Sequence, residues 1–488
     1  MVGHFQGMVP GAGRSTTAPL EVRAPFDGQL IAIVETADAR TVELALAMAY
    51  ALFRDPDRWL SPARRIEILR RAAQLMEARA PSLALETARE GGKPLVDSQV
   101  EVARAIDGVL NCAELLRNEA GHVIPMNVNA ASMNRVAFTQ REPIGVVVAV
   151  SAFNHPLNLI VHQVGPALAA GCPFIVKPAE DAPLSCFRFV EILREAGLPE
   201  AWGQALVTAT RDDAARLVSD RRVGFFSFIG SAAVGWMLRS RLAPGTRCAL
   251  EHGGAAPVIV APDVDLKMAL PKLAKGGFYH AGQVCVSVQR VFAHHSVVEP
   301  LAVGLGDLAK RLRVGDPTLP ETEVGPLIRP REVARADEWV KEALAGGAKL
   351  IAGGHPLSES CYAPTVLLDP PADCRVSTCE IFAPVICIYS FDDFDSALRR
   401  ANALPYAFQA AVFTRDLNTA LSAYARLDAS AVMVNDHTAF RVDWMPFAGL
   451  RESGLGVGGI PYSFRDMQIE KLLVLSPERA PSLAGDLS

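Results

Sequence analysis

The length, composition and charge of the chain are those of a multidomain globular protein. Its 488 residues, 50% hydrophobic and 21% charged, are too many for a single core. The net charge of −5 gives no basic surface for nucleic acid, and the longest apolar run, Gly145 to Phe153, is much shorter than the roughly 20 residues of a membrane helix. We therefore expect neither nucleic acid nor a membrane as a partner.

The first part of the chain predicts a short strand pair followed by helices. The turn Pro25-Phe26-Asp27-Gly28 lies between apolar segments of Leu20–Val34, which is typical of paired strands. Helical periodicity then predicts three helices, at about 38–53, 62–90 and 96–120. The segment from Pro125 to Glu142 is expected to be an extended hairpin with no obvious core to pack against.

From Pro143 onward, apolar runs of strand length alternate with helical segments. The strands we expect are Gly145–Val150, Phe174–Val176, Ala205–Val207, Val223–Phe228, Cys248–Leu250 and Val258–Val260. This alternation predicts a parallel sheet covered on both faces, which would bind ligands at the carboxyl ends of its strands. A second alternating region, about 261–440, predicts another α/β domain, and Phe464–Leu475 predicts a final strand. The fold class is α/β.

The nine cysteines are scattered and form no Cys-x-x-Cys pair, and no histidine cluster has the spacing of a zinc site. This pattern favours a reducing compartment and argues against a structural metal. The N-terminus also lacks the basic and then apolar pattern of a signal peptide. We therefore expect a cytoplasmic protein that holds no metal.

Polar residues follow the first two strands of the predicted sheet. Asn154 stands just after the first strand, where its amide could donate to an oxyanion, although asparagine is also favoured as a helix N-cap. Lys177 and Glu180 follow the second strand, and an acid at this place suits the hydroxyls of a nucleotide ribose. A surface ion pair is the alternative for Lys177 and Glu180.

Later segments carry further candidates for a nucleotide and a base. Gly230 to Gly235 join a strand to a helix, where phosphate can meet a helix N-terminus, but they lack the full glycine fingerprint. Glu251 precedes a flexible diglycine and could serve as a general base. Glu380 and Phe382 lie on the same side of an extended segment and could hold a sugar edge and a flat ring.

Cys285 is the candidate nucleophile. It follows the small Gly282-Gln283 turn, where glycine lets the backbone approach a ligand closely. The alternative is a buried structural thiol, because free cysteine usually behaves as a small hydrophobic residue. Reactivity requires a lowered pKa and access, which the segment alone does not establish.

Seven of these segments together resemble the aldehyde dehydrogenase superfamily, from about Pro25 to Leu475. They occur in the order of that family, with close to its spacing: Phe153-Asn154, Lys177-Pro178-Ala179-Glu180, Phe228-Ile229-Gly230-Ser231, Glu251-His252-Gly253-Gly254, Gly282-Gln283-Val284-Cys285, Glu380-Ile381-Phe382 and Pro446-Phe447-Ala448-Gly449. Three positions depart from the usual pattern: His252 replaces leucine, Ala255 replaces lysine and Ala448 replaces glycine.

The resemblance implies a role for each matching residue. Cys285 would be the nucleophile, Glu251 the general base and Asn154 an oxyanion donor. The residues implied for the cofactor are Ser151, Phe153, Lys177, Glu180, Gly230, Ser231, Val234, Gly253, Glu380 and Phe382. The cofactor is NAD or NADP, and Glu180 favours NAD because it would repel a 2′-phosphate, although Lys177 beside it would partly offset that repulsion.

The resemblance also implies a domain organisation. A Rossmann-like cofactor-binding domain would comprise 1–121 and 143–252, and a second α/β domain, the catalytic one, would comprise 253–440. A small β oligomerisation element would comprise 122–142 and 462–488, because family members pair these segments between subunits. We therefore expect a homodimer or a homotetramer.

The expected reaction is oxidation of a small aldehyde to the carboxylic acid. A CoA-acylating dehydrogenase and a catalytically silent protein are the alternatives, and the complete set of reacting residues, with Glu251 present, argues against both.

The segment Asn435–Asp443 resembles the branch of lactaldehyde, phosphonoacetaldehyde and non-phosphorylating glyceraldehyde-3-phosphate dehydrogenases. Arginines matching Arg104 and Arg441 reach the aldehyde pocket in that branch, and a guanidinium fits a carboxylate or phosphate. The alternatives are a helix-surface arginine for Arg104 and a structural loop contact for Arg441. Val284, where members acting on phosphorylated aldehydes tend to have arginine, argues against such substrates.

Overall fold

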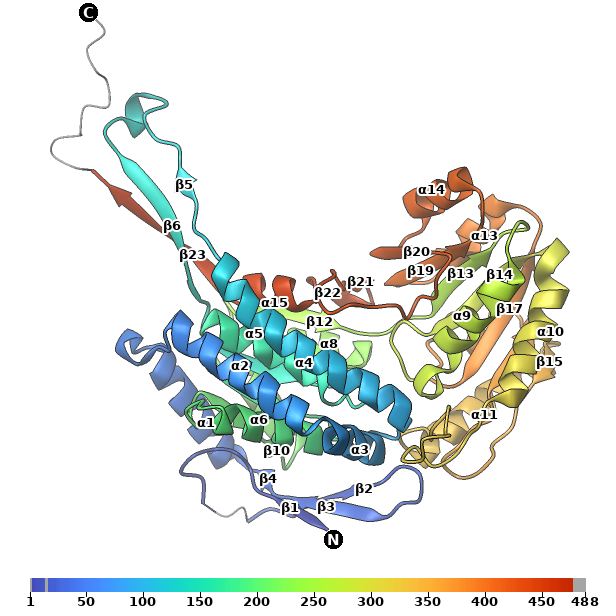
Figure 1. Cartoon of the computed structure of the whole chain (residues 1–488), viewed down its shortest axis with the longest axis horizontal. Helices are drawn as coiled ribbons and strands as arrows, with labels where there is room; N and C mark the ends of the chain where they lie inside the picture. Colours follow the sequence, from blue (N-terminus) through green and yellow to red (C-terminus); the bar gives the residue numbers. More distant parts are fainter. Residues whose placement is uncertain (1, 14–15, 477–488) are drawn as a thin grey trace, which may run out of the picture.

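The structure is a computed structural model that describes residues 2–13 and 16–476. Two α/β lobes lie side by side, and a β-sheet arm projects from the first of them (Figure 1). The helices are α1 (Ala39–Phe53), α2 (Pro62–Ala78), α3 (Ala80–Gly91), α4 (Leu95–Asn118), α5 (Asn158–Ala170), α6 (Leu184–Glu195), α7 (Arg211–Ser219), α8 (Ala232–Arg239), α9 (Leu266–Phe278), α10 (His295–Arg311), α11 (Pro330–Ala345), α12 (Arg375–Thr378), α13 (Phe394–Ala401), α14 (Leu417–Arg426) and α15 (Ile460–Asp466).

The first lobe is built on a six-stranded sheet with the order β22-β12-β11-β7-β8-β9. Its strands are β7 (Val146–Val150), β8 (Phe174–Lys177), β9 (Gly203–Ala205), β11 (Val223–Ile229), β12 (Arg247–Glu251) and β22 (Gly454–Leu455). Only β22 is antiparallel to its neighbour. This sheet is the mostly parallel cofactor sheet that the sequence predicts.

Helices cover both faces of the first sheet, because successive residues of a strand point to opposite sides. In β7, Val147 and Ala149 pack into a core with α2, α4, α5 and α6. Val146 and Val148 pack on the other face against α1, α7 and α8. The continuous apolar run of β7 is therefore explained by burial on both faces.

The second lobe is built on a seven-stranded sheet with the order β15-β16-β17-β14-β13-β19-β20. Its strands are β13 (Ala256–Val260), β14 (Val288–His294), β15 (Lys349–Ala352), β16 (Thr365–Leu368), β17 (Val385–Phe391), β19 (Gln409–Phe413) and β20 (Ala431–Val434). All are parallel except β15, and they share one core with α9, α10, α11, α13 and α14.

The arm is a three-stranded antiparallel sheet of β23 (Gln468–Leu475), β6 (Val136–Pro143) and β5 (Val123–Ile124). β23 pairs with β6 along its whole length, from Gln468 opposite Pro143 to Leu475 opposite Val136. The remaining strands form small sheets: β1 (Gly3–Phe5) with β3 (Leu30–Val34) and β2 (Leu20–Arg23), β4 (Thr36–Ala37) with β10 (Val207–Thr208), and β18 (Tyr406–Ala407) with β21 (Leu450–Arg451).

Five predicted elements differ from the structure. The helix expected at 62–90 is two helices, because the backbone leaves the helical path at Arg79 and Pro81 begins a new helix. The strand at 258–260 belongs to the second sheet, and the one at 205–207 is divided between β9 and β10. The final strand begins only at Gln468, because 460–466 form α15. The hairpin expected at 125–142 is mainly the single strand β6, whose long partner is β23.

The domain boundaries at 121, 142, 252 and 440 stay an interpretation of the sequence. The second sheet starts at Ala256 and ends at Val434. The part of the expected oligomerisation element from 477 to 488 lies outside the described residues.

Candidate active site

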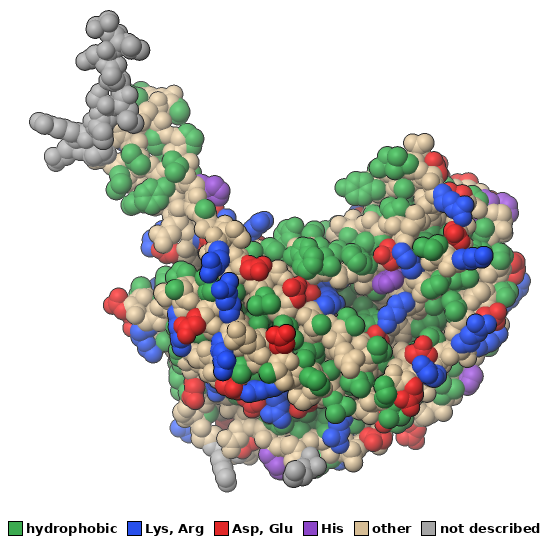
Figure 2. All heavy atoms as spheres, in the orientation of Figure 1, with side chains coloured by type: hydrophobic (Ala, Val, Ile, Leu, Met, Phe, Trp, Pro, Cys, Tyr) green, Lys and Arg blue, Asp and Glu red, His purple; other side chains and the backbone are tan. Residues whose placement is uncertain are grey.

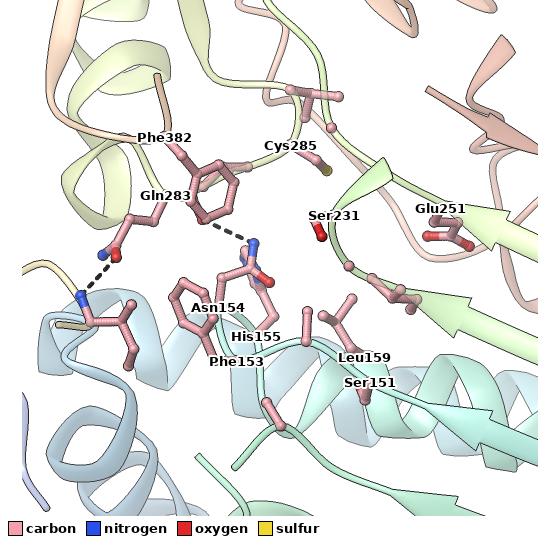
Figure 3. A pocket seen from close by; sticks show the side chains of 18 of the residues that line it. Ser151, Phe153, Asn154, His155, Leu159, Ser231, Glu251, Gln283, Cys285 and Phe382 are labelled. Atoms are coloured by element: carbon pink, nitrogen blue, oxygen red, sulfur yellow. Dashed lines mark hydrogen bonds between the residues drawn. The ribbon is translucent and has the colours of Figure 1, made fainter. Parts of the chain in front are cut away.

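A cavity of about 870 Å³ lies at the carboxyl ends of the strands of the first sheet and receives residues from the second lobe. Nearly all the site residues expected from the sequence line it: Arg104, Ser151, Phe153, Asn154, Glu180, Gly230, Ser231, Val234, Glu251, Gly253, Cys285, Glu380, Phe382 and Arg441. Lys177 is the exception: it does not line the cavity, but its Nζ lies 3.3 Å from the Glu180 carboxylate, which does. Figure 3 shows the Cys285 sulfur pointing into the space between Asn154, Ser231 and Glu251.

The topology of the first sheet explains why these residues meet. The strands β12, β11, β7 and β8 are neighbours and parallel, so their carboxyl ends share one edge. Glu251 ends β12, Ser231 follows β11, and Ser151 follows β7. Residues far apart in the sequence therefore line one side of the cavity without any special side-chain contact.

The loop that carries Cys285 is strained. His280, Ala281 and Gly282 have φ values of 47°, 53° and 71°, three consecutive residues in the left-handed region. Only the third is a glycine, and a Cβ there would collide with the Ala383 carbonyl. Non-glycine residues in this region cost of order 1–3 kcal/mol each, and such strain clusters at functional sites.

Side-chain amides hold this loop in place. Gln283 donates from Nε2 to the Pro326 carbonyl at 3.2 Å and accepts from the Ile328 N–H at 2.9 Å. The Asn154 amide donates to the Gln283 carbonyl at 2.9 Å, so it lies beside the cysteine loop in the cavity (Figure 3). The sequence placed Asn154 here but gave no sign of the anchoring role of Gln283.

Burial controls the electrostatics of the reacting groups. It raises the pKa of the Cys285 thiol to about 12, although the positive charge of Arg441 opposes this. It also raises the pKa of Glu251, which Arg441 again opposes. The thiol is therefore protonated at neutral pH in the structure as it stands, and its activation requires a proton acceptor. Gly458 leaves room for Glu251, since a Cβ at that position would collide with the carboxylate.

At the cofactor end, the Glu380 carboxylate accepts a hydrogen bond from the Gly254 N–H at 3.1 Å. Burial raises the pKa of Glu380 to about 7. A side chain at Gly253 would collide with this carboxylate, so the diglycine is required for the approach. Phe382 meets Phe153 edge to face at 6.0 Å between ring centroids, which leaves a flat apolar wall beside the acid. The Glu380 carboxylate fits a ribose, and the aromatic wall beside it fits a nicotinamide ring.

The unusual His252 is a structural residue. Its ring is 2% exposed and lies 5.6 Å from both Phe228 and Trp236. Its Nδ1 is 3.0 Å from the Gly230 carbonyl, so the neutral ring donates to the turn that precedes α8. A Cβ at Gly235 would collide with the imidazole. The imidazole at this position is therefore packed in place, and it forms part of the cavity lining.

The end of the cavity expected to bind the substrate, called the substrate end below, contains both predicted arginines, in different environments. Arg104, on α4, donates from Nη2 and Nε to the two oxygens of Asp443, at 2.7 and 3.1 Å. Arg441 lies over the Phe447 ring, with its guanidinium carbon 3.6 Å from the ring centroid, and contacts the Nδ1 atom of His162 at 3.2 Å. The sequence gave no sign of His162, and it gave Asp443 and Phe447 no role here, although both lie in segments that carry the family resemblance.

Comparisons with known proteins agree with this geometry. The Aldehyde dehydrogenase family matches residues 12–472. The chain belongs to the aldehyde dehydrogenase family. A 3-sulfolactaldehyde dehydrogenase of Priestia aryabhattai is 36% identical over 468 residues, which cover 96% of this chain and 97% of that relative.

Two solved aldehyde dehydrogenase structures superpose closely on this chain. Aldehyde dehydrogenase 21 from Physcomitrella patens, in complex with the reaction product succinate, has a TM-score of 0.93 at 32% identity, covering 97% of this chain and 98% of that one. The glyceraldehyde-3-phosphate dehydrogenase GapN from Methanocaldococcus jannaschii, complexed with NADP, has a TM-score of 0.90 at 31% identity, covering 95% and 100%. The resemblance predicted from the motifs is confirmed, and the chain is an NAD(P)-dependent aldehyde dehydrogenase.

This aldehyde dehydrogenase shows neither a membrane span nor a metal-binding group in the part of the chain that the structure describes. Among residues 2–13 and 16–476, no helix is long and apolar enough to cross a membrane. The same part of the chain contains no group of three or more His, Cys, Asp or Glu residues that could hold a metal ion.

Proposed function

We propose that this enzyme oxidises a small aldehyde with an anionic far end to the carboxylic acid, through a covalent intermediate on Cys285. The observation that carries the proposal is that one cavity brings together the Cys285 thiol, the Asn154 amide, the Glu251 carboxylate and the Arg441 guanidinium. A thiol, an amide donor and a base in one enclosed space suit acyl chemistry.

The reaction begins with the thiol. Cys285 loses its proton to an acceptor in the cavity, for which Glu251 is the candidate, and its sulfur bonds to the aldehyde carbon. The carbonyl oxygen becomes an oxyanion, which the Asn154 side-chain amide and the Cys285 backbone N–H stabilise. Losing one such donor typically costs about 100–1,000-fold in rate.

The tetrahedral thiohemiacetal can then release hydride, because the product is a thioester and no acyl cation forms. Bound NAD(P)+ supplies the hydride acceptor. Glu380, Phe382 and Phe153 would hold its ribose and ring in place, while Ser231 at the start of α8 would lie at its pyrophosphate. Glu251 first passes any proton that it took from the thiol to solvent and then takes a proton from water. The hydroxide adds to the thioester carbon, and the Cys285 thiolate leaves as the acid is released.

Several observations favour an aldehyde with a negative charge at its far end. Arg441 adds a part-buried cation to the substrate end of the cavity. The relative from Priestia aryabhattai is named for 3-sulfolactaldehyde, which bears a sulfonate, and the structure from Physcomitrella patens holds succinate, a dicarboxylate. Val284 beside the nucleophile supplies no second arginine of the kind expected for phosphorylated aldehydes.

One assay tests the reaction and its alternatives. Release of NADH or NADPH is measured with succinic semialdehyde, lactaldehyde and butanal, with and without CoA, for the wild type and Cys285→Ala. We expect turnover without CoA, a preference for the acidic aldehyde, and a loss of at least about 1,000-fold in Cys285→Ala. Turnover only with CoA would establish the acylating alternative, and no turnover with any aldehyde would indicate a silent protein. Equal kcat/KM for succinic semialdehyde and butanal would refute the anionic substrate class.

For the cofactor, we propose a preference for NAD over NADP. The supporting residue is Glu180, which lines the cavity and whose side chain is 53% exposed there. Lys177 contacts the same carboxylate, and Arg211 also lines this part of the cavity, so both would offset its repulsion of a 2′-phosphate. A kcat/KM for NADP ten or more times that for NAD would contradict the proposal.

For assembly, we propose a homodimer or a dimer of such dimers. Hydrophobic side chains gather on the arm (Figure 2), and those that are exposed include Val136, Phe138, Leu472, Leu473, Val474 and Leu475. β23 is also an edge strand, and an exposed apolar edge is a liability unless it is covered. Light scattering at micromolar concentration should give an oligomer, and Leu473→Lys should weaken it. A monomeric wild type would refute this assembly.

A further inference from the structure

A buried polar network lies behind the two arginines of the substrate end, with Asp443 at its centre. Asp443 is 2% exposed, and four hydrogen bonds converge on its carboxylate. Its Oδ1 accepts from His162 Nε2 at 2.7 Å, Asn158 Nδ2 at 3.1 Å and Arg104 Nη2 at 2.7 Å, and its Oδ2 accepts from Arg104 Nε at 3.1 Å. The network therefore joins α4, α5 and the loop that follows β20.

The tautomer of His162 follows from its two neighbours. Arg441 Nη2 lies 3.2 Å from Nδ1, and a guanidinium nitrogen can only donate. Nδ1 must therefore carry a lone pair, and the ring proton is on Nε2, where it is donated to Asp443. Burial and the charge of Arg441 lower the pKa of His162 to about 4, so the ring stays neutral at physiological pH.

The charge of Asp443 is balanced by Arg104 and not by Arg441. Arg104 forms the bidentate ion pair, and hydrogen bonds from His162 and Arg104 hold the pKa of Asp443 well below its usual range despite burial. Arg441 instead contacts the neutral imidazole and the face of Phe447. Within the described residues no carboxylate forms an ion pair with Arg441, and its Nε–H is buried without a hydrogen-bond partner.

A neutral acceptor and an aromatic face can hold a guanidinium without cancelling its charge. Both contacts fix the orientation of the planar group, and an arginine held in this way loses less conformational freedom when it binds an anion. The unused Nε–H of Arg441 is a donor that an oxygen of a bound anion could satisfy.

We propose that His162 is a positioning residue for substrate specificity: its Nδ1 lone pair holds the Arg441 guanidinium, which forms no ion pair in the described part of the chain, where the anionic end of the aldehyde binds. Asp443 fixes the tautomer that makes this possible and takes up the charge of Arg104. The inference deepens the proposed function and rests on its anionic substrate class. It assigns different roles to the two arginines of the cavity, since Arg441 binds the substrate while Arg104 supports the network.

Two variants of similar size test the two ring nitrogens of His162 separately. Gln at 162 places an amide near the Nε2 position, where it can still donate to Asp443, but offers no acceptor near Nδ1. Asn at 162 places its amide oxygen near Nδ1, where it can accept from Arg441. We expect His162→Gln to raise KM for succinic semialdehyde about tenfold, as loss of one charged hydrogen bond implies, with KM for butanal and both kcat values within about threefold of the wild type. His162→Asn should stay close to the wild type for both aldehydes.

Equal KM changes for both aldehydes in His162→Gln, or the same behaviour of His162→Gln and His162→Asn, would overturn the proposal and leave a structural role. A wild type without preference for succinic semialdehyde over butanal would instead refute the substrate class. A second experiment therefore tests the effect of the Arg441 charge without turnover. It measures by peptide mass spectrometry the rates at which iodoacetate, an anion, and neutral iodoacetamide alkylate Cys285. His162→Gln should lower the iodoacetate-to-iodoacetamide ratio at least threefold and His162→Asn should preserve it. An unchanged ratio in His162→Gln would also overturn the proposal.

Discussion

The two ends of the cavity are built in different ways. At the cofactor end, Ser151, Ser231 and Glu251 each follow or end a strand of one parallel sheet, and the order of the strands alone brings them together. At the substrate end, Arg104 and Arg441 come from α4 and from a loop after β20, and a shared network of side-chain hydrogen bonds determines their orientation.

This difference separates what the fold provides from what specificity requires. A cofactor site that depends on backbone topology persists when side chains elsewhere change. A site that depends on a buried network can change its preference through one residue of that network, because leaving a buried polar group unpaired costs about 1–3 kcal/mol. Function therefore resides in such local sites more than in the fold.

The largest expected effect is at Glu251, the candidate general base. Glu251→Gln should lower kcat about 100–1,000-fold, because the thioester is no longer hydrolysed by activated water. A first turnover of about one NADH per active site should remain in stopped-flow absorbance if Glu251 acts only on water. Loss of that burst as well would show that Glu251 also takes the thiol proton.

The pH dependence of kcat tests the same residue. A general base must be ionised, so kcat should fall as the pH drops through the pKa of Glu251, which burial places above its ordinary value. This acidic limb should therefore occur at a higher pH than for an exposed glutamate, and it should vanish in Glu251→Gln. A limb that persists unchanged in the variant would assign it to another group.

The next effect should be confined to the substrate end. Arg441→Ala removes the cation and should raise KM for succinic semialdehyde about 10–100-fold, as expected for a charged hydrogen bond, with little change for butanal or for NAD. Arg415→Ala, at a side chain that is 67% exposed, is the matched control and should change none of these values. Equal losses for both aldehydes would show that Arg441 holds the loop and does not recognise substrate.

The sequence predicted the cofactor end better than the substrate end for a physical reason. Motif residues such as Glu251 and Cys285 lie next to glycines whose backbone freedom the chemistry needs, so a short segment identifies them. His162 lies in the interior of α5, where every residue is buried, and nothing in its local sequence separates a network histidine from a packed one. The role of Asp443 could be recognised only from its contact with Arg104, which lies 339 positions earlier in the sequence.

The fold, like the site, was predicted well where a local pattern marks an element and poorly where distant contacts determine it. Most of the strands that the sequence located have apolar runs buried on both faces, as β7 does, and their positions were predicted within a few residues. The final strand was placed too early, because the amphipathic segment 460–466 forms α15 and only then continues into β23. Its partner β6 lies more than 300 positions earlier, and no local pattern predicts that pairing.

The smallest effect concerns stability at the cofactor end. The pKa of Glu380 is raised to about 7 by burial, so the folded state binds this proton more tightly than the unfolded chain does. The carboxyl group therefore destabilises the cofactor-free fold progressively as the pH rises above its ordinary value of 4.5, and fully above about 7. Glu380→Gln removes the charge and should raise Tm by about 1–3 °C at pH 8.5 and by much less at pH 5.

Differential scanning calorimetry of the cofactor-free enzyme at the two pH values measures this difference, and the same variant should raise KM for NAD because an acceptor for ribose is lost. Glu321→Gln, at an exposed position, is the control and should leave Tm unchanged at both pH values. A gain in Tm that is equal at pH 5 and pH 8.5 would show that the charge of Glu380 is not its cause. A pH-dependent gain together with a weaker cofactor would show that the cofactor end, although determined by topology, keeps a buried acid for binding at a cost in stability.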